Sequence, residues 1–160
     1  MESSVYWLVL IALFFVVNDI DFGAMKLAKM VTPSLQTLRR VELNVIIDSH
    51  SKDPLAVLCD ELEHISGKNR LESIKIQIDL QIDIDCRSGT EWGRLEKVLL
   101  HSGWPMLKYI SLVIVINSHY ELRIDGPFGM ALKNLPQTQF TGLMSSKNLD
   151  FRFSVQEIRI

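Results

Sequence analysis

The chain has 160 residues, of which 48% are hydrophobic, and a formal net charge of −2 at pH 7. This length and composition suit one domain with a substantial hydrophobic core, and the scattered positive charges lack the basic footprint of a nucleic-acid-binding protein. Cys59 and Cys86 lie outside any CxxC motif or Cys/His cluster, which argues against a metal site and favours two buried, reduced thiols, with a disulfide as the alternative.

Residues 5–17 form an unbroken apolar run at the start of the chain. The run is shorter than the ~20 helical residues that span a bilayer. Signal peptides usually have basic residues before their apolar stretch, and this run has none before it. Three interpretations stay open: a buried strand or helix of a first repeat, a weak signal or anchor, or a gene-boundary artefact. We therefore divide the chain into an apolar segment, 1–18, and one strand-helix domain, 19–160.

The next elements are a helix, a strand and a second helix. Asp21 is a suitable N-cap for the first helix, which Pro33 ends. Residues 40–48 are rich in Val and Ile, as strands are. The second helix has Pro54 at its first position and Gly67 as its C-terminal stop. Its inward residues follow helical spacing, and they are Leu55, Leu58, Cys59, Leu62 and Ile65. Its acidic residues, Asp60, Glu61 and Glu63, are expected to point outward.

Residues 74–86 alternate between apolar and polar side chains, which predicts a strand with one buried and one solvated face. A helix from Thr90 to about Gly103 follows, and its flanking residues Trp92 and Trp104 are expected in the core. Residues 109–116 predict the next strand. A short helix over residues 130–135, ended by Pro136, precedes a last strand over residues 149–155.

Four strand segments begin with a leucine, at Leu38, Leu71, Leu107 and Leu149, with spacings of 33, 36 and 42 residues. Repetition at this period is typical of stacked strand-helix units, and strands joined by crossover helices pair in parallel. We therefore predict an α/β fold, a short leucine-rich-repeat-like solenoid with a parallel sheet. Aligning the repeats predicts a buried row of Val41, Ile74, Ile110 and Phe151. The adjacent solvated row is Glu42, Lys75, Ser111 and Arg152, with a favourable Glu42–Lys75 pair.

Several segments of the chain are similar to known repeat proteins. They are TPSL at 32–35, ELEHISGKN at 61–69, EWGRL at 91–95, GWPML at 103–107 and LPQTQF at 135–140. Over residues 32–157 the chain resembles the leucine-rich-repeat-like regions of uncharacterised mushroom-type (basidiomycete) fungal proteins, many of which are F-box proteins. The resemblance implies a curved strand-helix array and, where an F-box is present, substrate reception for a ubiquitin ligase. This sequence shows no F-box helical segment and lacks the Asn or Cys that closes each consensus leucine-rich strand.

The chain carries no motif for catalysis or cofactor binding. Asp79, Asp83 and Asp85 share one strand face. Their charges are best explained as keeping a solvated strand edge soluble. An acidic docking patch is the first alternative, and a cation site is the second, although such a site needs more oxygen ligands. The four histidines, His50, His64, His101 and His119, lie near predicted turns or helix ends, without a partner for general-base catalysis. We therefore predict that the protein is not an enzyme and has no cofactor, metal or small-molecule ligand.

The predicted function is a non-enzymatic protein–protein interaction module that presents its polar strand face. An open array needs capped ends, and the apolar run 5–17 is no finished cap, so two interpretations stay open: the chain is a fragment of a longer receptor, of F-box type if the resemblance holds, or the run is covered by a membrane or a partner. Its partner is a protein and not a nucleic acid, and its location is cytoplasmic or nuclear. The alternative is a membrane-anchored or secreted protein that uses residues 5–17 as anchor or signal. The residues predicted to contact the partner are Glu42, Lys75, Gln77, Asp79, Tyr109 and Arg152.

Overall fold

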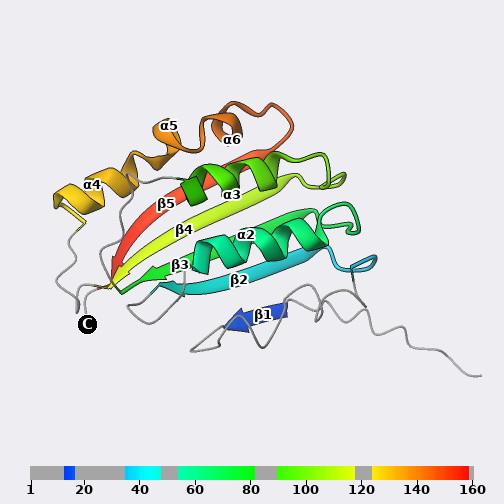
Figure 1. Ribbon diagram of the computed structural model, residues 1–160, viewed down its shortest axis with the longest axis horizontal. Helices are drawn as coiled ribbons and strands as arrows, with labels where there is room; N and C mark the ends of the chain where they lie inside the picture. The colour runs from blue at the N-terminus through cyan, green and yellow to red at the C-terminus, as the bar shows by residue number, and fades with distance from the viewer. Residues whose placement is uncertain (1–12, 17–34, 48–53, 82–89, 118–123, 159–160) are drawn as a thin grey trace, which may run out of the picture.

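The computed structural model describes residues 13–16, 35–47, 54–81, 90–117 and 124–158 (Figure 1). The strands are β1 (Leu13–Val16), β2 (Arg40–Ile47), β3 (Ser73–Leu80), β4 (Tyr109–Asn117) and β5 (Asp150–Ile158). The helices are α2 (Pro54–Ile65), α3 (Thr90–Leu100), α4 (Pro127–Lys133), α5 (Leu135–Thr138) and α6 (Thr141–Ser145). The helix predicted from Asp21 and the cysteine Cys86 lie outside these residues.

The strands form one parallel sheet in the order β1-β2-β3-β4-β5, so each strand pairs with the next strand along the chain. Helices α2 and α3 lie side by side across one side of this sheet (Figure 1). The predicted α/β class with strands and helices in alternation is therefore confirmed. Strand β1 lies within the apolar run 5–17, whose other residues are outside the described part of the chain, and the interpretations of that run stay predictions.

The strand register confirms both predicted rows. Val41 pairs with Ile74, Ile74 with Ile110, and Ile110 with Phe151. The leading leucine of the last repeat is offset by one residue. Leu107 lies three residues before Ile110 of the buried row, whereas Leu149 lies only two residues before Phe151. Strand β3 ends at Leu80 and matches the length of β2, and residues 82–86 of the predicted strand lie outside the described part of the chain.

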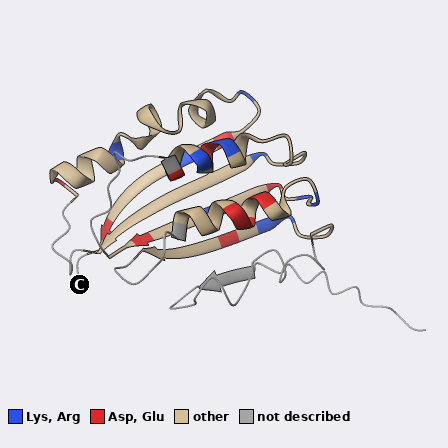
Figure 2. Ribbon diagram, in the orientation of Figure 1, with Lys and Arg blue, Asp and Glu red and all other residues tan. Residues whose placement is uncertain are grey.

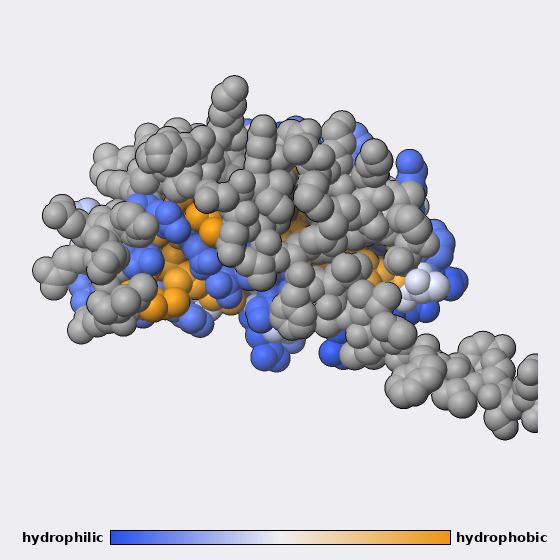
Figure 3. All heavy atoms as spheres, turned by 90° about the horizontal axis from the view of Figure 1, so that it is seen from below, coloured by the Kyte–Doolittle hydropathy of each residue, from blue (hydrophilic) through white to orange (hydrophobic). Residues whose placement is uncertain are grey.

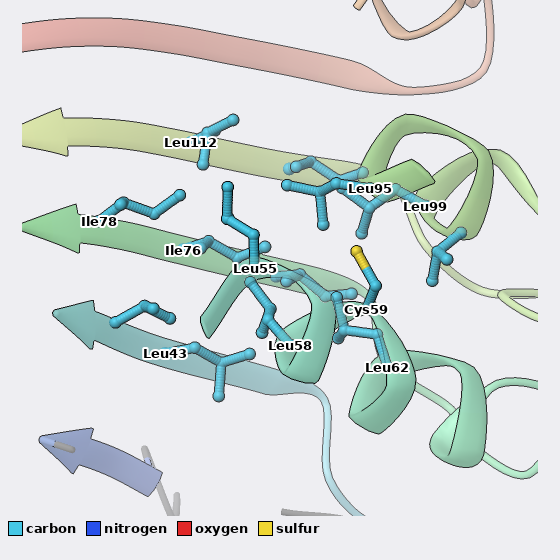
Figure 4. Close-up of a cluster of buried hydrophobic side chains, with 14 of the residues drawn as sticks. Leu43, Leu55, Leu58, Cys59, Leu62, Ile76, Ile78, Leu95, Leu99 and Leu112 are labelled. Carbon is cyan, nitrogen blue, oxygen red and sulfur yellow. The ribbon is translucent and has the colours of Figure 1, made fainter. Parts of the chain in front are cut away.

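The core lies between the sheet and its helices, and Figure 4 shows its centre. Side chains of β2, β3 and β4, such as Leu43, Ile76 and Leu112, meet the apolar stripe of α2 and the inward side of α3. All five predicted stripe residues of α2 are buried, as are Trp92 and Trp104. Glu61 is buried too, contrary to the prediction, because it follows Leu58 by one helical turn and so borders the stripe.

Burial of the inward side chains falls off at the last strand. Those of β3 and β4 are fully buried, whereas Phe151, Phe153 and Val155 of β5 are only partly buried. The chain between β4 and β5 contributes Phe140, which is fully buried against the rings of Phe151 and Phe153. Strand β5 therefore closes the core with help from the α5–α6 connection.

The prediction that Pro136 ends a helix is wrong. Helix α4 stops at Lys133, and Pro136 lies in the first turn of the separate helix α5. A proline is tolerated there because the first amide groups of a helix have no partner within it. Helix α6 is held to α3 by Glu96, whose Oε1 accepts hydrogen bonds from the amides of Gly142 (2.6 Å) and Leu143 (3.1 Å).

Asn69 links two successive helix-to-strand turns. Its Nδ2 donates to the carbonyls of Ile65 (2.9 Å) and Gly103 (3.2 Å), and its Oδ1 accepts from the amide of Leu71 (3.1 Å). The side chain is buried. Gln36, 33 residues earlier, makes a similar but exposed bond to the carbonyl of Lys68 (2.9 Å). Side-chain amides thus connect each of these turns to the turn of the following repeat.

We expect the substitution Asn69→Ala to lower the free energy of unfolding by about 2 kcal/mol. It removes three hydrogen bonds, so the carbonyls of Ile65 and Gly103 and the amide of Leu71 lose this partner. Urea unfolding measures the change. The matched control is Gln36→Ala, which removes one exposed bond and should change the stability by less than about 0.5 kcal/mol. Equal losses in both variants would show that burial of Asn69 contributes nothing.

Candidate binding face of the sheet

The residues of β2–β5 that point away from the core form a second face of the sheet, here termed the polar strand face. Helices α2 to α6 bury their apolar residues in the core on the opposite side, so no helix of the described residues packs on this face. Its members are Arg40, Glu42, Asn44, Ile46, Ser73, Lys75, Gln77, Asp79, Tyr109, Ser111, Val113, Val115, Asn117, Asp150, Arg152, Ser154, Gln156 and Ile158.

All six residues predicted to contact a partner lie on this face. Glu42, Lys75 and Arg152 share one row, and Ser111 completes it between Lys75 and Arg152. Tyr109 lies in the row before, and Gln77 and Asp79 lie in the two rows after. Asp83 and Asp85, which were expected to continue this face, are outside the described residues.

The predicted cross-strand pair is present. Lys75 Nζ donates to Glu42 Oε2 at 3.4 Å, and the two side chains remain 42% and 35% exposed. Because solvent screens such a pair, it stabilises the sheet only slightly. It also holds the Lys75 ammonium group in place on the β2 side of its strand.

A double-mutant cycle with Glu42→Ala and Lys75→Ala should give a coupling energy of about 0.4 kcal/mol. The coupling should fall in 1 M salt, which screens charges over about 3 Å. Urea unfolding of the four proteins checks both expectations. Asp125 and Lys133, 4.0 Å apart with Asp125 76% exposed, offer a comparison pair that should couple less. A Glu42–Lys75 coupling that does not depend on salt would contradict an ion pair.

Arg152 has two described partners on the polar strand face, Tyr109 and Asp150. Its guanidinium lies 5.3 Å from the centre of the Tyr109 ring, and its Nη2 donates to Asp150 Oδ2 at 3.3 Å. The hydrogen bond with Asp150 raises the pKa of the guanidinium above its ordinary value, so the group stays charged. Stacking on an aromatic ring also fixes the orientation of the side chain.

The rest of the face is less charged. Gln77 Nε2 donates to Asp79 Oδ1 at 3.0 Å along β3. Beside them on β4 are Val113, which is half-buried, and Val115, which is 4% exposed although it points away from the helices. Sequence alternation alone did not indicate that Val115 would be buried. Seen from below the view of Figure 1, the coloured part of the surface has hydrophobic and hydrophilic residues side by side (Figure 3).

A second cluster of charges lies on the helical side, where acidic residues of α2 and basic residues of α3 are neighbours (Figure 2). Arg94 forms ion pairs with Asp60, with Glu63 (3.1 Å) and with Glu91 (3.8 Å). Hydrogen bonds to Glu63 and Asp60 raise the pKa of the guanidinium. The cluster connects α2 to α3 and is a structural contact.

The described thiol and imidazole groups are those of Cys59, His64 and His101. Desolvation by burial raises the pKa of the Cys59 thiol to about 12, so the group is protonated at neutral pH. His64 Nδ1 lies 2.7 Å from the carbonyl of Asp60, and His101 Nδ1 accepts from the amide of Gly103 at 3.1 Å. These are helix-end contacts, as predicted. His50 and His119 are outside the described residues.

The described residues offer neither a metal-binding cluster nor a membrane-spanning helix. They contain no group of three or more His, Cys, Asp or Glu side chains arranged to hold a metal ion. Among the helices in this part of the chain, none combines the length and apolarity needed to cross a membrane.

In comparisons with known proteins, no protein-family model, curated protein or solved structure matches this chain.

Proposed function

We propose that this protein is a non-enzymatic protein-interaction module that binds a partner protein through the polar strand face. The observation that supports the proposal most is the position of Lys75, Gln77, Tyr109 and Arg152 on one sheet face that no described helix covers. Half-exposed polar, aromatic and arginine side chains on a rigid sheet are suited to recognition. The fold in this proposal is a short leucine-rich-repeat-like solenoid, like the fungal F-box-type receptors that the sequence resembles.

The proposal is tested with a photocrosslinking residue placed on each side of the sheet. One variant carries p-benzoylphenylalanine at Gln77 on the polar strand face, and the other carries it at Lys97, an exposed position of α3. Both full-length variants are expressed and irradiated in cells. The proposal expects a protein adduct from position 77 that is absent at position 97. Adducts only at position 97, or none at either position, would contradict it.

The alternative function depends on the apolar run 5–17, whose composition suits an anchor or signal. It expects the full chain to resist carbonate extraction from membranes, or to have a processed N-terminus. A shortened chain starting at Asp19 is the comparison. If the full chain is extracted by carbonate and has an unprocessed N-terminus, the alternative is wrong.

A further inference from the structure

We infer that the row formed by Lys75, Ser111 and Arg152 is a carboxylate-binding site, and that the partner presents an extended segment with an aspartate or glutamate over Ser111. The inference rests on the proposed function and specifies the chemistry of the partner. It follows from the register of three strands and from the positions of two ion pairs.

Ser111 lies between two cations. Its Cα partners are Lys75 on β3 and Arg152 on β5, and neighbouring strands are about 4.8 Å apart. The Lys75 side chain is 42% exposed and that of Arg152 is 69% exposed. A carboxylate above Ser111 therefore has a hydroxyl below it and, on either side, a strand that carries a flexible, exposed cation. Turning either cation from its present partner, Glu42 or Asp150, toward this carboxylate would form a charge-assisted hydrogen bond.

Two described carboxylates, Glu42 and Asp150, lie at the margins of that position. Glu42 meets Lys75 from β2, on the side away from Ser111. Asp150 meets Arg152 from two residues earlier on the same strand, next to Tyr109. Tyr109 holds the guanidinium from the preceding row. In the absence of a partner these contacts hold the two charged groups toward β2 and toward the preceding row, and no carboxylate of the described strands lies between Lys75 and Arg152 in their row.

The balance of charge favours a single acidic side chain over a polyanion. The polar strand face carries three cations and three carboxylates, namely Arg40, Lys75, Arg152, Glu42, Asp79 and Asp150. A nucleic acid or an anionic lipid surface requires an excess of positive charge. A polar peptide with a single carboxylate requires no such excess, because its other groups can contact the three carboxylates of the face. Val113, two residues beyond Ser111, is suited to an apolar side chain two residues from the acidic one, since both extended chains advance about 6.6 Å per two residues.

The test uses fluorescein-labelled nine-residue peptide libraries with Glu, Gln or Lys fixed at the centre and mixed residues elsewhere. Binding to the full-length chain is measured by fluorescence anisotropy at low salt. We expect the Glu-centred library to bind about tenfold more tightly than the Gln-centred one. The double variant Lys75→Gln/Arg152→Gln should abolish this difference, and Lys75→Glu/Arg152→Glu should transfer the preference to the Lys-centred library.

The matched control is Lys97→Gln/Lys133→Gln, which changes the net charge equally at two exposed positions on α3 and α4. It should keep the preference for glutamate. The inference is wrong if the libraries do not differ, if none binds, or if the control loses the preference to the same extent. Crosslinking from position 77 together with libraries that do not differ would contradict the carboxylate site and leave the proposed function intact. Loss of crosslinking at that position would contradict the function itself.

Discussion

Replacing Phe140 with alanine is expected to lower the free energy of unfolding by about 4 kcal/mol, the largest effect of any single substitution considered. The ring is fully buried and lies 6.1 Å from the ring centre of Trp92, 5.8 Å from that of Phe151 and 5.9 Å from that of Phe153. The substitution leaves a cavity between α3, β5 and the α5–α6 connection, and aromatic-to-alanine changes in cores typically cost about 3–5 kcal/mol. Urea unfolding followed by circular dichroism measures the loss.

Two further variants separate cavity formation from a general sensitivity of this segment. Phe140→Leu keeps most of the buried volume and should lose less than half as much stability. Met144→Ala changes a side chain of the same segment that is 56% exposed, and it should have little effect. A loss below about 1 kcal/mol for Phe140→Ala would mean that this ring does not close the core at β5.

Gly103→Ala is expected to destabilise the protein by about 3 kcal/mol, because there is no space for a methyl group at this position. A Cβ atom there would overlap Ser66 Oγ and lie 2.9 Å from the backbone nitrogen of Gly67. The carbonyl of Gly103 also accepts bonds from the Gly67 amide (2.7 Å) and from Asn69 (3.2 Å). Any movement that relieves the overlap weakens these bonds, so the effect exceeds that of ordinary overpacking.

Gly93→Ala is the matched control for that substitution. At Gly93, inside α3, the nearest atom to an added Cβ is Gln139 Oε1 at 3.2 Å, the end of a flexible side chain. We expect a gain of about 0.5–1 kcal/mol, since alanine favours the helix over glycine. Thermal and urea unfolding of both variants test the contrast. A stable Gly103→Ala variant would contradict the close approach of the two turns.

The paired strands are the part of the fold that sequence periodicity predicted best. Alternation in β3 and the leucine spacing placed Ile74 next to Val41 and Ile110, because a register shift by one residue would turn every apolar side chain of a strand to solvent. The same constraint brought Lys75 beside Glu42. This constraint on the register is weaker at β5, where the inward residues are only partly buried and the leading leucine is offset by one residue.

The connections could not be predicted from periodicity, because their contacts join residues far apart in the chain. Phe140 was part of a recognisable segment, yet its packing on Phe151 depends on how the crossover folds back. Asn69 was expected only as part of a helix ending, and its bond to Gly103 spans 34 residues. On the polar strand face, alternation predicted which side chains point outward. It could not indicate the contact of Arg152 with Tyr109 or the burial of Val115.

The partial burial of β5 has a consequence for local opening of the protein. Each strand pairs only with its chain neighbours, so β5 can separate from β4 without disturbing the pairing of β2 with β3. Amide hydrogen exchange should therefore be slowest in β3 and faster in β5, at a free energy below that of global unfolding. Such opening transiently exposes Phe151 and Phe153, so the rate of aggregation should follow the population of this partly open state.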